Sequence, residues 1–434
     1  MLMLGFSGST LDDTIRTDLA TRNLGGVILM GGNCLSPQQI RQLTASINTV
    51  ATTPPFIATD QEGGLVARLN LNNGYAKTYT EYQLGSYFAS LDSTSAQATR
   101  MAGWMSDAGM SVDLAPVVDV DVNPSSPAIG ALGRSFSSNP AVVAAHAQRF
   151  LDAFHERKLI TCVKHFPGHG SAGTDSHLTL PDITNTWADS ELLPYRTLLA
   201  SKSLDMVMVG HLFNAHRDSV YPSSLSKNTV TGLLRDSIGY SGVVISDDFY
   251  NMKAITDNFG FGQTAILAVN AGVDILLFVS DIKNGMSLCR QLIDTIETGV
   301  HNGAIAEARI DEAYNRILEL KRAYFITAIA AARGSGTNPG GSPVVSNYPN
   351  PFNPSTTVRY ILQGTAYVTV RVYDVLGREI ETLSEGFVEA GVHAVTWNAA
   401  GHASGVYFCK VTAKNEGPSG GRLSSTVHPL VLVR

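Results

Sequence analysis

Residues 140–165 read PAVVAAHAQRFLDAFHERKLITCVKH and combine a helix pattern with a strand pattern. Across Pro140–Glu156 the apolar residues recur every three or four positions, which predicts an amphipathic helix. The run Ile160–His165 is apolar until its last two residues, as in a strand that is buried on both faces. A helix that leads directly into such a strand is typical of an α/β fold with a parallel sheet.

The same alternation continues up to residue 331. Ser36–Val50 has a second helix pattern, and further short apolar runs predict strands. Eight such units over roughly 320 residues favour a (β/α)8, TIM-like barrel over an open doubly wound sheet. No glycine-rich dinucleotide fingerprint follows the first strand, which argues further against the open sheet. The predicted strands are Met1–Phe6, Gly26–Met30, Phe56–Asp60, Val112–Val120, Ile160–His165, Met206–His211, Val243–Asp247 and Val273–Phe278.

The composition changes after this region. Residues 332–346, ARGSGTNPGGSPVVS, are rich in Gly, Ser and Pro and are typical of a flexible linker. Residues 347–434 contain alternating or β-branched runs separated by turn residues, which predict a small all-β, immunoglobulin-like sandwich. The barrel is therefore expected over residues 1–331. The predicted strands of the sandwich are Thr357–Leu362, Tyr367–Val375, Val392–Trp397, Gly405–Thr412 and Ser424–Val433.

Composition and charge exclude several classes of protein. The 434 residues are 44% hydrophobic and 16% charged, as in a well-buried globular chain. A net charge of −6 provides no basic patch for nucleic acid, and no apolar run is long enough for a transmembrane helix. The four cysteines lack paired spacing, so buried free thiols are expected. The N-terminus MLMLGF lacks the features of a signal peptide, and we expect an export signal to have been lost upstream.

Ionisable residues gather at the predicted strand ends, where a barrel of this type forms its active site. Asp60 ends the third strand, Lys164 and His165 end the fifth, His211 ends the sixth and Asp247 ends the seventh. A single acidic residue after a strand is usually a helix N-cap. Capping alone does not explain ionisable groups at so many strand ends, which indicates a catalytic site.

The segment 164–177, KHFPGHGSAGTDSH, predicts a glycine-rich loop beside the barrel mouth. Asp175 and His177 are two residues apart, so a turn can bring the carboxylate to a ring nitrogen and make the histidine a general acid/base. His165, His169, His177 and Asp175 could alternatively bind zinc. Pro167 and the glycines disfavour the helix that an HxxxH metal site uses.

Asp247 follows the apolar run Gly242–Ile245 and is expected to project into the barrel mouth. A carboxylate there can attack an anomeric carbon and form a glycosyl-enzyme intermediate. Asp248 is expected to cap or support the next helix.

Three motifs together resemble family 3 glycoside hydrolases, and in particular their single-barrel β-N-acetylglucosaminidase branch. These motifs are KHFPGHG followed by DSH, ISDD after a strand, and ATDQEGG with a later Arg. The resemblance covers nearly all of Met1–Phe325. It implies that Asp247 is the nucleophile, and that His177 is the general acid/base with Asp175 as its partner. It also implies that sugar hydroxyls are bound by Asp60, Arg68, Arg134, Lys164 and His165.

The chain departs from the family pattern at two places. Leu65 stands where the family commonly has Arg after EGG, so this chain lacks that basic side chain for substrate contacts. The stretch IGALGRSF lengthens the loop before Arg134.

The tail resembles the C-terminal sorting domain of type IX secretion substrates. The motifs NYPNPFNPSTTVRY, VYDVLGREI and SGVYF carry this resemblance. It implies export by the type IX secretion machinery and a secreted or cell-surface location. A carbohydrate-binding sandwich is the rival interpretation, because Tyr360, Tyr373, Trp397 and Tyr407 could stack on sugars, although alternating aromatics in a sandwich are more often core.

These observations predict a retaining exo-β-N-acetylglucosaminidase that acts on chitin- or peptidoglycan-derived sugars and needs no metal or organic cofactor. Alternatives within the enzyme class are a β-glucosidase, a β-xylosidase or a phosphorylase that uses inorganic phosphate as acceptor. Another is a catalytically inactive surface protein that only binds carbohydrate.

Overall fold

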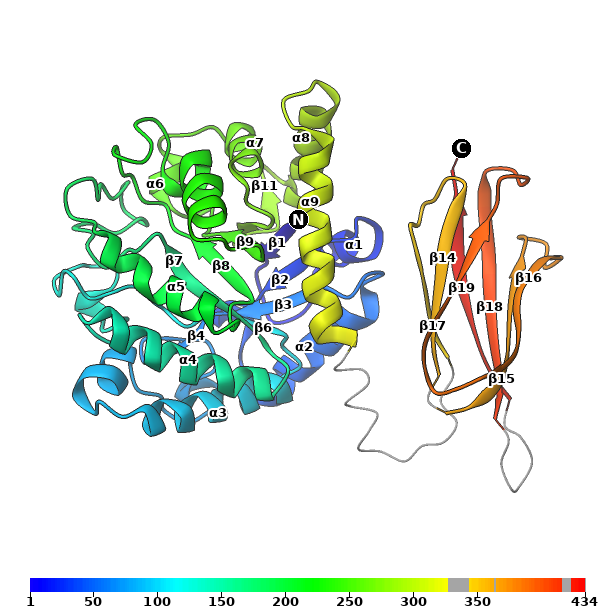
Figure 1. Cartoon of the computed structure of the whole chain (residues 1–434), viewed down its shortest axis with the longest axis horizontal. Helices are drawn as coiled ribbons and strands as arrows, with labels where there is room; N and C mark the ends of the chain where they lie inside the picture. Colours follow the sequence, from blue (N-terminus) through cyan, green and yellow to red (C-terminus); the bar gives the residue numbers. More distant parts are fainter. Residues whose placement is uncertain (327–342, 363, 416–422, 434) are drawn as a thin grey trace. The chain divides into compact units, whose positions relative to one another are not determined.

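The computed structural model describes residues 1–326, 343–362, 364–415 and 423–433 (Figure 1). The chain divides into two compact units, Met1–Thr327 and Ala328–Arg434. Most of the linker expected over residues 332–346 lies outside the described residues. Its last three residues, 344–346, already belong to a strand of the second unit.

The first unit is a parallel barrel, as the sequence predicts. Its eight strands hydrogen-bond in the order β10-β1-β2-β3-β6-β7-β8-β9. A parallel β-bridge between Ile245 of β9 and Ile275, just before β10, connects the two edge strands of this sheet and so closes the barrel. The strands are β1 Leu2–Gly5, β2 Gly26–Ile28, β3 Phe56–Thr59, β6 Val112–Asp113, β7 Ile160–Phe166, β8 Met206–Val209, β9 Val243–Ser246 and β10 Leu276–Phe278.

Helices between these strands form the outer layer of the barrel (Figure 1). Both predicted helices are confirmed, as α2 and α4, and each begins with Pro after a polar N-cap. The side chain of Ser36 accepts the N–H of Gln39 at 3.2 Å, which stabilises the start of α2. The helices are α1 Asp13–Thr21, α2 Pro37–Val50, α3 Leu91–Asp107, α4 Pro140–Glu156, α5 Leu193–Ala200, α6 Lys253–Thr256, α7 Phe261–Ala271, α8 Leu288–His301 and α9 Glu307–Lys321, with a π-helical segment η7 Asn228–Ser237.

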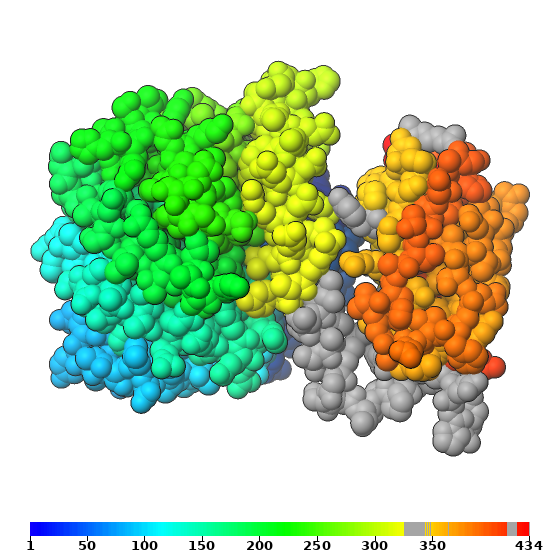
Figure 2. Space-filling view, in the orientation of Figure 1, coloured from blue at the N-terminus to red at the C-terminus, as the bar shows by residue number. Residues whose placement is uncertain are grey.

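Helix α9 lies on the surface of the first unit, where Figure 2 shows it as a ridge of the space-filled surface. Its buried residues are Ala313 and Ile317. Ile317 joins the apolar cluster inside the barrel, together with Met3, Phe56 and Val243 at the beginnings of their strands. Helix α9 therefore packs against the N-terminal end of the barrel, opposite the mouth.

The second unit is a sandwich of two antiparallel sheets. The sheets have the orders β13-β14-β17 and β16-β15-β18-β19. Two strands are absent from the sequence prediction, β13 and β16. Strand β16 contains Glu379, Glu381 and Glu385, and no residue along it is fully buried, so an apolar pattern is missing there. The strands are β13 Val344–Tyr348, β14 Ser355–Leu362, β15 Ala366–Tyr373, β16 Glu379–Val388, β17 Gly391–Asn398, β18 Gly405–Asn415 and β19 Leu423–Leu432.

Three of the four aromatic residues named for the rival interpretation lie in the core of this sandwich. Trp397 is fully buried, and Tyr360 and Tyr407 are nearly so. Phe352 packs against Trp397 with a ring-centroid distance of 5.4 Å. The rival interpretation as a sugar-stacking module therefore loses three of its four aromatic side chains, while Tyr373 is half-buried.

All four cysteines, Cys34, Cys162, Cys289 and Cys409, are buried free thiols, as expected. Among the helices of the described residues, none combines the length and apolarity needed to cross a membrane.

Candidate active site

A short hairpin directly follows β3 and carries the first group of predicted site residues. Asp60 lies between β3 and the hairpin strands β4 (Gln61–Gly63) and β5 (Val66–Ala67). Its carboxylate oxygens contact Lys164 Nζ at 2.9 Å and Arg68 Nη2 at 3.1 Å. Burial alone raises the pKa of Asp60, but the positive charges of Lys164 and Arg68 outweigh it and hold this pKa below its usual value.

Glu62 links this group to Arg134, and sequence reasoning missed it. Its carboxylate binds Arg134 through two hydrogen bonds of 2.8 and 2.9 Å and lies 2.7 Å from Lys164 Nζ. The side chains of Glu62 and Lys164 are each only 2% exposed. Burial opposes the charge of Glu62, but Arg134 and Lys164 keep its pKa well below the ordinary range. The carboxylate is therefore a fixed anion between two cations.

His165 is held in place by Asp119, at the end of the predicted fourth strand. His165 Nδ1 lies 2.7 Å from Asp119 Oδ2, and the N–H groups of His165 and His169 both donate to Asp119 Oδ1. Arg134 Nη2 lies 3.4 Å from His165 Nε2. All five predicted sugar-binding residues thus lie in one connected network, despite the lengthened loop before Arg134.

Asp247 lies directly after β9 and is 8% exposed. Its backbone N–H donates to the carbonyl of Val209, and its carboxylate accepts the N–H of Asp248 at 2.8 Å. The Asp248 side chain accepts the N–H groups of Tyr250 and Val279. Asp248 therefore supports the turn after β9 and the end of β10, whereas the N-cap of α6 is Met252.

Asp175 and His177 form the predicted pair. His177 Nδ1 lies 2.8 Å from Asp175 Oδ1, and the same oxygen accepts the His177 backbone N–H at 2.9 Å. Burial raises the pKa of Asp175, but the N–H and ring of His177 outweigh it and lower that pKa. The His177 side chain is 60% exposed, so its other face is accessible from solvent.

The loop that carries this pair is attached to the segment that follows Asp247. The N–H of Ala254 in α6 donates to the carbonyl of Ser176, and the Ser176 hydroxyl contacts Met252 Sδ at 3.6 Å. His211 ends the neighbouring strand region, and its ring nitrogens lie 2.7 Å from Ser224 Oγ and 3.2 Å from the carbonyl oxygen of Asp248. Burial lowers the pKa of His211, the charge of Asp247 raises it and the charge of His177 lowers it. The loop of Asp175 and His177 is therefore joined to the segment that follows Asp247.

Two of the histidines named for the zinc alternative are each paired with a carboxylate. His165 is paired with Asp119, and His177 with Asp175. His169 is buried, and burial lowers its pKa to about 4. Within the described part of the chain, no three His, Cys, Asp or Glu side chains are grouped to hold a metal ion.

Residues 2–320 match the family model of the glycosyl hydrolase family 3 N-terminal domain. The chain belongs to glycoside hydrolase family 3. Beta-hexosaminidase A of Pseudoalteromonas piscicida is 31% identical over 72% of this chain, and the match covers 56% of that protein. A beta-hexosaminidase of Tolumonas auensis is 35% identical over 64% of this chain and 81% of its own length.

The solved structure of a glycoside hydrolase family 3 beta-N-acetylglucosaminidase from Paenibacillus sp. superposes with a TM-score of 0.69 at 31% identity. The match covers 75% of this family 3 chain and 61% of that one. The chain thus spans less than two thirds of the length of two of these relatives. Residues 346–419 match the model of a secretion system C-terminal sorting domain, which indicates secretion or a cell-surface location.

Proposed function

We propose that this family 3 chain is a retaining exo-β-N-acetylglucosaminidase that hydrolyses terminal β-linked N-acetylglucosamine from chitin- or peptidoglycan-derived sugars. The observation that carries the proposal is the attachment of the Asp175–His177 loop to the segment after Asp247 through Ser176 and Ala254. Two relatives are described as beta-hexosaminidases, which supports an amino-sugar substrate.

In the first step, Asp247 attacks the anomeric carbon while His177 protonates the leaving oxygen, which gives a covalent glycosyl-enzyme. In the second step, His177 removes a proton from water, which attacks the same carbon and releases Asp247. Two inversions retain the β configuration. Asp175 holds the imidazole tautomer and stabilises the imidazolium that forms when His177 accepts a proton.

The network around Lys164 is suited to binding sugar hydroxyls. Lys164 and Arg68 donate hydrogen bonds, and the Asp60 carboxylate accepts them. Because Glu62 and Arg134 fix Lys164 from the other side, the site is rigid before substrate arrives. None of these steps requires a metal ion or an organic cofactor.

The test is an activity panel on aryl glycosides. We expect hydrolysis of aryl N-acetyl-β-glucosaminide, with the β-anomer of the free sugar formed first in proton NMR. Faster turnover of aryl β-glucoside or β-xyloside would contradict the substrate, and first formation of the α-anomer would contradict the mechanism. A sugar 1-phosphate formed in phosphate buffer would identify a phosphorylase. Chitooligosaccharide binding without turnover would identify an inactive binding protein.

We further propose that the sandwich directs export by the type IX secretion machinery. The match of residues 346–419 to a sorting domain supports this. Fusion of residues 343–434 to a periplasmic reporter in a host with that machinery tests it. Export of the reporter is expected, and its retention in the periplasm would contradict the proposal.

A further inference from the structure

Exposed apolar side chains gather at the rim of the barrel mouth. Residues 78–90 lie between the hairpin after β3 and helix α3, and residues 129–134 lie between β6 and α4. Segments that lead from a strand to the following helix form the mouth of a parallel barrel. Together with the turn of the hairpin, they carry six exposed side chains, here called the aromatic patch, which are Leu65, Tyr79, Tyr82, Tyr87, Phe88 and Leu132.

Three rings form the aromatic half of this patch. The ring of Phe88 packs edge-on against Tyr79 and Tyr87, with centroid distances of 4.9 and 5.3 Å. The hydroxyl of Ser86 donates to the carbonyl of Phe136 at 2.7 Å, which fixes the backbone beside these rings. Tyr87 is nevertheless 76% exposed, so most of its ring faces solvent.

The two leucines of the patch lie on either side of Thr80. A side chain at Gly64 would collide with Thr80, and one at Gly133 would lie 3.3 Å from the Thr80 hydroxyl. Leu65 directly follows the first of these glycines, and Leu132 directly precedes the second. These are the two places where the chain departs from the family pattern. Both departures therefore place an apolar side chain on the same surface.

The aromatic patch is joined to the proposed sugar-binding network at both ends of the Glu62–Arg134 ion pair. The N–H of Gly64, two residues after Glu62, donates to the hydroxyl of Thr78 at 3.0 Å. The N–H of Tyr82 donates at 3.1 Å to the carbonyl of the residue before Arg134. The patch thus continues the surface of the network outward from this ion pair.

The aromatic patch is uncharged. Residues 78–90 read TYTEYQLGSYFAS, in which Glu81 is the one ionisable residue besides the tyrosines. Glu81 is buried and accepts the N–H of Val117 at 2.9 Å. Burial and the charge of Glu62 raise the pKa of Glu81 well above its usual value, which favours its uncharged form. The six members of the patch therefore suit the apolar faces of neutral sugar rings and offer no cation to the carboxylates of a peptidoglycan peptide.

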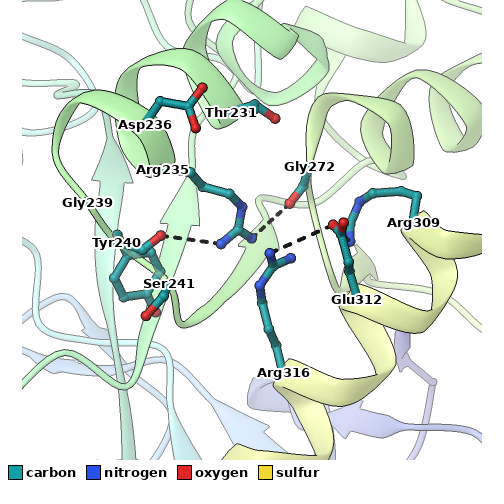
Figure 3. Close-up of a pocket in the computed structure, with 10 residues that line it drawn as sticks. All are labelled: Thr231, Arg235, Asp236, Gly239, Tyr240, Ser241, Gly272, Arg309, Glu312 and Arg316. Carbon is teal, nitrogen blue, oxygen red and sulfur yellow. Dashed lines mark hydrogen bonds and ion pairs between the residues drawn. The ribbon is translucent and has the colours of Figure 1, made fainter.

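The pocket between η7 and α9 has the opposite character (Figure 3). Its three arginines, Arg235, Arg309 and Arg316, each form an ion pair with the buried carboxylate of Asp274. Glu312 adds two longer ion pairs. The charges of that pocket are balanced within the chain, whereas the rings of the aromatic patch face solvent. Contiguous exposed apolar surface of this kind usually marks a binding site.

We propose that the aromatic patch binds the third and later N-acetylglucosamine units of a chitooligosaccharide while its terminal unit occupies the proposed active site. This inference rests on the proposed function and deepens it, because it selects a chitin-derived chain over a peptidoglycan fragment as substrate. Tyr82, Tyr87 and Phe88 contact the apolar faces of the sugar rings. The units next to the cleaved bond do not reach the patch, which lies beyond the Glu62–Arg134 pair as seen from Lys164.

The test compares kcat/KM of the full chain on chitobiose and on chitotetraose. The double variant Tyr82→Ala/Tyr87→Ala should lower kcat/KM on chitotetraose about tenfold, since each lost aromatic contact costs about threefold. Chitobiose and an aryl N-acetyl-β-glucosaminide should be cleaved as by wild type, because both end before the patch. The matched control is Tyr314→Ala, which removes an exposed tyrosine of α9 at the opposite end of the barrel and should change neither value.

Three results would overturn the proposal. One is an equal fall on chitobiose and chitotetraose, which would give the two tyrosines a structural role. Another is unchanged cleavage of chitotetraose by the double variant, including the case in which slower sedimentation shows that a contact between two copies of the chain was lost. The third is a loss confined to a disaccharide peptide of peptidoglycan.

Failure of the proposed function gives a different result, namely wild-type chain that cleaves none of these substrates. Calorimetric titration with chitotetraose then decides about the patch. Weaker binding to the double variant than to wild type and Tyr314→Ala would support the proposal, and equal or undetectable binding in all three would overturn it.

Discussion

The backbone N–H of Ala254 donates a 3.1 Å hydrogen bond to the carbonyl oxygen of Ser176. Ser176 lies between Asp175 and His177, and Ala254 lies in the short helix that follows Asp247. One backbone contact therefore connects the loop of the proposed acid/base with the segment after the proposed nucleophile. We expect the relative position of the two proposed catalytic groups to depend on this contact.

Ala254→Pro removes that N–H and should loosen the loop. A hydrogen bond of this kind contributes about 1 kcal/mol, so kcat/KM should fall roughly fivefold to tenfold. The matched control is Lys253→Pro, at the exposed first position of the same helix, where proline is well tolerated. An equal fall of kcat/KM in the two variants would show that the loss comes from a changed helix α6 and not from the missing hydrogen bond to Ser176.

Asp247→Ala should lower kcat on an aryl N-acetyl-β-glucosaminide by on the order of 10⁴-fold or more, because the glycosyl-enzyme can no longer form. Sodium azide should restore part of the turnover by attacking the face that the carboxylate occupied, which gives the α-glycosyl azide. Activity close to wild type, or formation of the β-azide, would contradict the role of Asp247 as nucleophile.

With His177→Ala, azide should give the anomer opposite to the one that it gives with Asp247→Ala. An activated aryl leaving group needs little protonation, so the glycosyl-enzyme accumulates and azide should produce the β-glycosyl azide.

Asp175→Asn, which keeps the size of the side chain but removes its charge, should lower kcat about 10²- to 10⁴-fold. An Asp175→Asn enzyme with unchanged kcat and pH profile would contradict the dyad.

Glu62→Gln should destabilise the barrel, because it leaves Lys164 and Arg134 with too little negative charge in a buried site. Removing one partner of a buried ion pair costs about 3–5 kcal/mol. Urea unfolding of the full chain, followed through the barrel transition, measures this loss. Glu297→Gln, at an exposed position of α8, is the control. A change of similar size in both variants would contradict the proposed role of Glu62.

The buried carboxyl group of Glu191 should make the folded protein less stable as the pH becomes alkaline. The residue is fully buried beneath the loop at Gly168, and burial raises its pKa from 4.5 to about 8. Because the folded-state pKa is raised, stability is fully present below pH 4.5 and is lost as the pH rises through about 8.

Glu191→Gln keeps the shape of the neutral carboxyl and cannot ionise. The fall in the free energy of unfolding between pH 5 and pH 8.5 should therefore be smaller in Glu191→Gln than in wild type. Parallel profiles for the two proteins would assign the pH dependence to other groups.

The barrel strands and the proposed catalytic motifs could be predicted from the sequence, because the signal for each lies in a few consecutive residues. The ion pair of Glu62 could not be predicted, because its partner Arg134 lies 72 residues away and no local sequence pattern indicates their pairing. Glu191 was missed for a similar reason, since a charged residue at the start of a helix is usually solvated. Strand β16 was missed because its acidic side chains mask any alternation.

The hydrogen bonds of Phe352 have a consequence for when the sandwich can assemble. Its N–H donates to Val431 and its carbonyl accepts the N–H of Val433. A segment that precedes β14 thus pairs with the end of β19, the last strand of the sandwich. Both segments must have been synthesised before this pairing can form, so a chain that stops before residue 431 lacks the contact.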